Sequence, residues 1–198
     1  SASAAELGFP APVGAIAAAV AGTPPGAWRV GVDLFPDGRV EVVRTALTPL
    51  GTPVTVLLAD APWPRNPLAR HKTSWRTHLD DAWRAAEAVG AFDTIGYDDA
   101  GRVLEGGRST VFALIDGAWV TPPVGLGVLP GVQRAALLLD AGAVEARPDH
   151  LVVGGDPLDE LRRRPGRRQT PVFVAEGLGE AVDGIQVARD AHRLAGHD

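Results

Sequence analysis

The chain contains no cysteine, which excludes disulfides and thiolate chemistry and favours a cytoplasmic protein. No apolar run approaches the roughly 20 residues that cross a bilayer, so we expect no membrane partner. The net charge of −5 provides no basic field for nucleic acid. The histidines lack the spacing of zinc ligands, and we therefore expect no metal site.

Lysine is almost absent, since Lys72 is the only one among 19 Lys and Arg residues. A guanidinium stays charged, whereas a partly buried lysine amine can lose its proton and form an imine with a carbonyl. Lys72 is therefore a candidate Schiff-base residue. The alternative is a surface cation without a chemical role.

The 198 residues are enough for one sizeable domain or two small ones. The opening pattern predicts a short helix followed by a three-stranded meander, at Pro12–Ala21, Trp28–Phe35, Val40–Leu47 and Pro53–Leu58. The proline-rich stretch Ala61–Leu68 is typical of a linker. We therefore expect a reduced amino-terminal lobe with its linker at 1–69 and a carboxy-terminal domain at 70–198.

The second part begins with a helix that Thr73 or Ser74 can cap and that runs to about Val89. Strands and turns then dominate to about Thr121, and another helix is expected from Gly131 through Leu139. A strand, a helix, a strand and a last helix follow, at Ala143–Arg147, Leu158–Arg163, Pro171–Ala175 and after Val187. This mixed order predicts an α+β (mixed α/β) fold, not a parallel doubly wound sheet.

Three features form a chemically coherent set. An imine-forming lysine suits pyridoxal phosphate, whose ring nitrogen needs a carboxylate partner, and Glu105 can supply one. The cofactor phosphate needs backbone N–H donors at a helix N-terminus, and Gly131, Val132 and Gln133 occupy such a position. Taken separately, a glutamate beside glycine is usually a turn residue, and Leu-Pro-Gly is usually only a helix start.

In this order the motifs resemble the class IV pyridoxal-phosphate aminotransferases, or fold type IV. Asp-x-x-Gly-x-Val-x-Glu-Gly, Val-Phe, Asp-Gly, Thr-Pro-Pro and Leu-Pro-Gly-x-x-Arg follow one another between Asp98 and Arg134. The resemblance covers roughly Arg70 to Val187. It implies a two-lobed fold with a truncated first lobe, pyridoxal 5'-phosphate as cofactor, a small-molecule amino compound as partner and a homodimer.

Carried over by position, the resemblance implies that Lys72 forms the imine and moves protons at the substrate α-carbon. It implies that Glu105 partners the pyridine nitrogen. The implied wall and phosphate-binding turns consist of Leu129, Gly131, Val132, Gln133, Gly177 and Leu178. Arg76 and Arg108 are the implied substrate-binding residues.

Within the family, His71-Lys72-Thr73 with Arg76 is more similar to 4-amino-4-deoxychorismate lyase, which releases pyruvate. Two alternatives stay open. One is an aminotransferase acting on branched-chain amino acids, D-amino acids or amines. The other is a non-catalytic homologue that binds the cofactor or a partner, because the family's longer first lobe, with its Gly-Asp-Gly-x-Phe-Glu-Thr-like segment and phosphate-binding arginine, is not found before Lys72.

Overall fold

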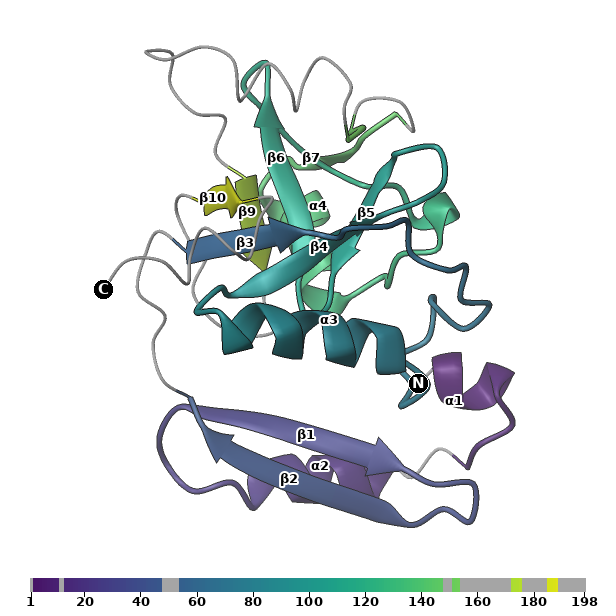
Figure 1. Ribbon diagram of the computed structural model, residues 1–198. Helices are drawn as coiled ribbons and strands as arrows, with labels where there is room; N and C mark the ends of the chain where they lie inside the picture. The colour runs from purple at the N-terminus through teal and green to yellow at the C-terminus, as the bar shows by residue number, and fades with distance from the viewer. Residues whose placement is uncertain are drawn as a thin grey trace. The chain divides into compact units, whose positions relative to one another are not determined.

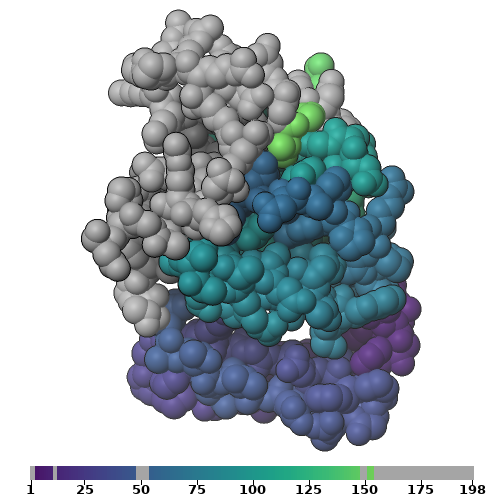
Figure 2. Space-filling view, viewed as in Figure 1, coloured from purple at the N-terminus to yellow at the C-terminus, as the bar shows by residue number. Residues whose placement is uncertain are grey.

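The computed structural model describes residues 2–10, 13–47, 54–147 and 151–153, and the backbone of 172–175 and 185–188 (Figure 1). Two compact units, Ser1–Leu50 and Gly51–Asp198, divide the chain. Figure 2 is a space-filling view that draws in colour the residues whose side chains are described. Across the described ranges, no helix is both long enough and apolar enough to cross a membrane.

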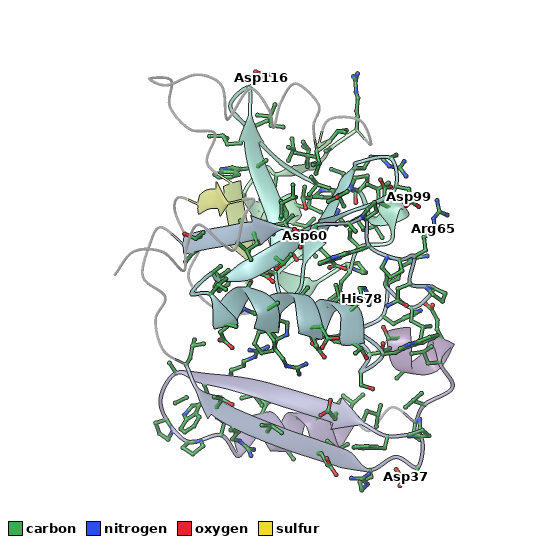
Figure 3. All side chains as sticks on the ribbon, viewed as in Figure 1. Asp37, Asp60, Arg65, His78, Asp99 and Asp116 are labelled. Atoms are coloured by element: carbon green, nitrogen blue, oxygen red, sulfur yellow. The ribbon has the colours of Figure 1, made fainter. Side chains whose placement is uncertain are left out.

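The first unit consists of two helices and a hairpin. Helices α1 (Ala2–Glu6) and α2 (Val13–Ala21) precede strands β1 (Trp28–Leu34) and β2 (Val40–Ala46), which pair antiparallel. The turn between the strands contains Asp37, labelled in Figure 3, and Gly38 with a φ of 86°. A left-handed φ of this kind favours glycine, and the predicted helix and hairpin are confirmed.

Strand β3 (Val54–Leu58) does not extend this hairpin, so the predicted three-stranded meander is wrong. β3 pairs parallel with β4 (Asp93–Tyr97) and parallel with β10 (Ile185–Ala188) in the second unit. Its sequence explains the difference, because neighbouring residues Val56 and Leu57 are both buried. A strand buried on both faces is typical of the middle of a parallel arrangement, not of a hairpin with one wet face.

The sheet that contains β3 has the order β10-β3-β4-β5, where β5 (Val103–Gly106) is antiparallel to β4. Helix α3 (Thr77–Ala88) packs along β4, where the Thr94 hydroxyl donates to the Ala82 carbonyl at 2.9 Å. The predicted cap at Thr73 or Ser74 is wrong, because Arg76 occupies the cap position and no side chain bonds to the first turn.

A second four-stranded sheet has the order β8-β7-β6-β9, formed by Val144–Glu145, Ala118–Thr121, Thr110–Ile115 and Val172–Ala175. Asp116, labelled in Figure 3 at the tip of the β6–β7 turn, has a φ of 50°. The 3₁₀ turn η1 (Val124–Leu126) and helix α4 (Val132–Asp140) follow β7. The predicted helices near 158–163 and after Val187 lie outside the described residues.

One hydrophobic core lies between the elements of these two sheets. Its buried members are Val56, Phe92, Ile95, Val103, Val111, Ala113, Val120, Ala146 and Leu151. Most come from strands in which one face is apolar, so the β-branched and aromatic residues fill the interior. The mixed α+β architecture expected from the sequence is confirmed, and the core fixes the ends of β4, β5 and β6, where polar residues gather.

Candidate active site

Glu105 lies near the end of β5, with its side chain directed at the loop that precedes α4. Its Oε2 accepts a hydrogen bond from the backbone N–H of Leu129 at 3.3 Å. Burial raises the pKa of Glu105 to about 7, although that hydrogen bond and the charges of Arg76 and Lys72 lower it. A carboxyl group tuned to neutral pH can hold or release a proton under working conditions.

Lys72 lies in the segment between β3 and α3, and its side chain is exposed. Its positive charge nevertheless acts on Glu105 and lowers the pKa of that carboxyl group. The structure therefore brings together four of the predicted site residues, namely Lys72, Arg76, Glu105 and Leu129.

Arg76 connects the start of α3 to the residues that follow Glu105. Its Nη2 donates a hydrogen bond to the carbonyl oxygen of Gly107. Its Nε donates to Oδ1 of Asp80 at 2.9 Å, one helical turn further on. Figure 3 labels His78 in this first turn of α3. The described contacts of Arg76 are thus with the turn behind Glu105, and its predicted role in substrate binding stays a prediction.

Asp93 is a site residue that the sequence analysis did not find. It is fully buried at the start of β4 and lies against the turn Gly106–Ser109. Its carboxylate accepts hydrogen bonds from the backbone N–H of Arg108 at 3.1 Å and from the Ser109 hydroxyl. Burial raises the pKa of Asp93 despite these bonds. The sequence signal that could have indicated this contact is the pair Gly106-Gly107, because glycine is favoured where another group comes close to the backbone.

Arg108 lies on the other side of this turn, between aromatic rings. Its guanidinium carbon is 4.6 Å from the centre of the Phe92 ring and 5.1 Å from that of Trp83. Its Nη2 donates to the carbonyl oxygen of Phe92 at 2.6 Å. These contacts hold Arg108 against α3, and the structure does not group it with Lys72. Its predicted contact with a substrate stays a prediction.

The loop between β7 and α4 leads to the predicted phosphate turn. Gly131 occupies the cap position of α4 with no side-chain cap, and Val132 is 85% exposed. The first N–H groups of a helix have no acceptor within the helix, so Val132 and Gln133 can offer donors there. A shallow pocket of about 320 Å³ lies beside this loop, lined by Arg70, Val124, Gly125 and Gly127.

Arg134 fixes the position of this helix start. Its Nη2 donates to the Pro122 carbonyl at 2.9 Å and to Oε1 of Glu145 at 2.6 Å. Glu145 also accepts the N–H of Val124 at 3.1 Å. The predicted residues Gly177 and Leu178 lie outside the described residues. Over the described part of the chain, no group of three or more His, Asp or Glu could hold a metal ion.

Comparison with known proteins shows the family of the chain. The model of amino-transferase class IV matches residues 14–148, more than half of the sequence. The chain therefore belongs to the class IV aminotransferase family, a family of enzymes that depend on pyridoxal phosphate. The comparison with curated proteins found no match.

Solved structures support the same fold. A putative amino-acid aminotransferase from Mesorhizobium loti is 29% identical with a TM-score of 0.76, over 94% of this chain and 87% of its own. A putative 4-amino-4-deoxychorismate lyase from Legionella pneumophila is 19% identical with a TM-score of 0.60, over 79% and 59%. A putative branched-chain amino acid aminotransferase from Thermotoga maritima is 24% identical with a TM-score of 0.64, over 84% and 62%.

These likenesses confirm the predicted fold type IV architecture. The chain spans less than two thirds of the Legionella and Thermotoga chains but most of the Mesorhizobium chain.

The residues present fit the family's cofactor. A desolvated carboxyl group whose pKa lies near 7 can share a proton with a pyridine nitrogen, and the charge of Lys72 acts on it. The helix start at Gly131 follows Leu129 by two residues, and Leu129 itself donates to Glu105. One short segment thus joins the carboxyl group to donors suited to a phosphate.

Proposed function

We propose that the chain is a pyridoxal-phosphate enzyme that acts on a small amino compound through Lys72 and Glu105. The observation that supports this most directly is that the charge of the only lysine acts on a desolvated carboxyl group, which also accepts a hydrogen bond from Leu129. Lys72 would hold the cofactor aldehyde, Glu105 the ring nitrogen, and the N–H groups at the start of α4 the phosphate. The bound cofactor supplies an electron sink for negative charge at the substrate α-carbon.

The protein's own part in this chemistry is proton handling. Glu105 holds a proton below about pH 7 and releases it above, since burial sets its pKa there. Such a group can keep the ring nitrogen of a ligand protonated. Lys72 would also supply the base that moves a proton at the substrate α-carbon.

We propose amino transfer as the reaction. The Mesorhizobium protein, described as a putative amino-acid aminotransferase, is similar along 94% of this chain. The second candidate is pyruvate release of the 4-amino-4-deoxychorismate lyase type, which the arrangement His71-Lys72-Thr73 with Arg76 favours. Arg76 bonds to Gly107 and Asp80, so its presence is weaker support for a substrate contact. We therefore rank the lyase reaction second.

The scarcity of lysine makes the attachment test unusually sharp. The protein is incubated with pyridoxal phosphate, reduced with borohydride and digested, and mass spectrometry locates the modified residue. We expect one adduct, at Lys72, and none in Lys72→Ala. Arg84→Lys is the matched control, because it adds an exposed lysine on α3 whose neighbouring carboxylate, that of Asp81, is also exposed. If the adduct at position 84 is as abundant as that at Lys72, the cofactor reacts with any exposed lysine, which would contradict a specific binding site at Lys72.

The reaction is identified with the loaded enzyme. Amino transfer from an amino acid to an added keto acid supports the first candidate. Pyruvate release from 4-amino-4-deoxychorismate without any keto acid supports the second. An adduct at Lys72 with neither activity would leave the chain a cofactor-binding protein, the third possibility raised by the sequence. We also propose a homodimer, which a monomeric mass in sizing experiments would contradict.

A further inference from the structure

The turn behind Glu105 is built around a second carboxyl group, that of Asp93. The backbone N–H of Gly106 donates to the Ser109 carbonyl at 2.8 Å, and the N–H of Gly107 donates to the Thr94 carbonyl at 3.1 Å. These bonds close a tight turn directly after Glu105. The carboxylate of Asp93 lies inside it and accepts from Arg108 and Ser109, as well as from the N–H of Thr94 at 2.8 Å.

The two glycines of the turn are required by this arrangement. A Cβ at Gly106 would collide with the Asp93 carboxylate and the Ser109 hydroxyl. A Cβ at Gly107 would lie 2.6 Å from the Leu79 carbonyl and 3.0 Å from Oδ1 of Asp93. The turn therefore packs closely against Asp93. Arg76 also donates a hydrogen bond to the Gly107 carbonyl of the same turn. Glu105 is the residue immediately before this held segment.

We propose that Asp93 is a positioning residue, which sets the place of the Glu105 carboxyl group by holding the turn Gly106–Ser109. The catalytic use of this positioning rests on the proposed function, whereas the contacts that position Glu105 are present in the protein without any cofactor. Asp93 has no described contact with Lys72 or with the α4 start, so it acts through Glu105. Its negative charge also acts on Glu105, in opposition to Arg76 and Lys72, and favours the protonated form.

The β4–β5 hairpin offers a matched control at its other end. Asp98 holds the turn there by accepting the N–H of Ala100 at 3.0 Å and that of Arg102 at 2.9 Å. Asp93 is thus the first residue of β4 and Asp98 follows its last residue, and each organises a turn through backbone N–H groups. Only Asp93 adjoins the turn that follows Glu105. Asp93→Asn and Asp98→Asn make the same chemical change at these two places.

The experiment follows Glu105 in the cofactor-free protein by nuclear magnetic resonance. The Leu129 amide, which donates to Glu105, reports the titration of that carboxyl group. We expect Asp93→Asn to move the midpoint down by about one pH unit and to reduce the change in the Leu129 amide shift, because a negative charge is lost and the turn loosens. Asp98→Asn should leave both unchanged. A Leu129 titration in Asp93→Asn equal to that of the wild type would overturn the proposal.

Ser109→Ala keeps the experiment decisive if Asp93→Asn does not fold. It removes one donor to Asp93 and leaves the backbone bonds of the turn in place, so a smaller change in the same Leu129 titration is expected. Ser109→Thr retains the hydroxyl and should restore the wild-type titration, whereas an unchanged Ser109→Ala protein would overturn the proposal. The measurement needs no cofactor, so a failure of pyridoxal phosphate to bind would count against the proposed function alone.

Discussion

Glu105 and Glu145 bind two ends of the same loop, yet their pKa values move in opposite directions. Glu105 accepts the N–H of Leu129 at 3.3 Å, and Glu145 accepts that of Val124 at 3.1 Å. Burial raises the pKa of Glu105 to about 7. The hydrogen bond from the Arg134 side chain, followed by that from Val124, lowers the pKa of Glu145.

The difference separates a structural carboxylate from a chemical one. Glu145 has a direct arginine partner and a side chain that is 44% exposed, so its charge is stable and its work is to hold the loop. Glu105 is half-buried with a desolvated carboxyl group, and the charges of Arg76 and Lys72 do not offset that lost hydration. A carboxyl group left near its titration midpoint at neutral pH is costly for the fold, and such a cost is typical of functional sites.

Among the variants that test this difference between the two glutamates, Glu105→Gln should change the free energy of unfolding most. The pKa of Glu105 rises from 4.5 in the unfolded chain to about 7 in the folded protein, so folded Glu105 binds its proton more tightly. Its contribution to the free energy of unfolding is therefore complete below pH 4.5 and declines by about 3 kcal/mol as the pH rises through 7. The glutamine variant lacks this decline.

The measurement is urea unfolding of the wild type and Glu105→Gln at several pH values between 4.5 and 8. Asp93, whose pKa burial also raises, contributes the same trend to both proteins, so the difference between the two isolates Glu105. We expect the variant to gain stability relative to the wild type as the pH rises. If the difference in unfolding free energy between the two proteins does not depend on pH, the pKa of Glu105 is not raised and the contrast with Glu145 is wrong.

Arg134→Gln should have the next largest effect, on the structural side of the comparison. Arg134 is 4% exposed and bonds to both Pro122 and Glu145, so its loss leaves a buried carbonyl unpaired. We expect a loss of about 2 kcal/mol of unfolding free energy, the scale of hydrogen bonds to a charged group.

The control for Arg134 is Arg84→Gln, which removes an exposed ion pair with Asp81 and should change stability by less than about 0.5 kcal/mol. Urea unfolding compares the two variants. The pKa of Glu145 should rise in Arg134→Gln, while the titration of Glu105 stays as in the wild type. If Glu105 also shifts, the loop transmits changes between its two ends and the comparison must be revised.

Glu145→Gln should have the smallest effect. Because its side chain is partly exposed, we expect a loss of less than about 1 kcal/mol at neutral pH. The pKa of Glu145 is lowered in the folded protein, so its stabilisation is present above the usual range of glutamate and disappears as the pH falls. The same unfolding series should therefore show a slope opposite in sign to that of Glu105→Gln. A slope of the same sign would contradict the assignment.

Much of the fold followed from local pattern. The alternation in β1 and β2, the turn at Asp37 and Gly38, and the helix start at Gly131 are encoded within a few residues. The partner of β3 was missed because an apolar run does not reveal which strand lies beside it, and β10 comes from more than 120 residues later. The α3 cap was missed because Arg76 bonds across to Gly107 and begins the helix after the serine and threonine.

The candidate site divides in the same way. Lys72 and Glu105 were visible as residue types at a family-like spacing, and the structure brings them near each other. Asp93 was not visible, because a lone aspartate before a strand resembles any turn residue. Its role depends on Gly106 and Ser109 folding back onto it, which is a tertiary contact. Local sequence indicated the groups that do chemistry more readily than the group that holds them.

The parallel pairing of β3 with β10 has a consequence for biosynthesis. The strand beside β4, which supports the Glu105 turn, gains its second neighbour only from residues 185–188. Contacts so distant along the chain form slowly, since a long segment must first be closed into a loop. On the ribosome, β3 therefore exposes an unpaired edge until residues 185–188 have emerged, and chaperones that cover such edges would assist this protein up to that point.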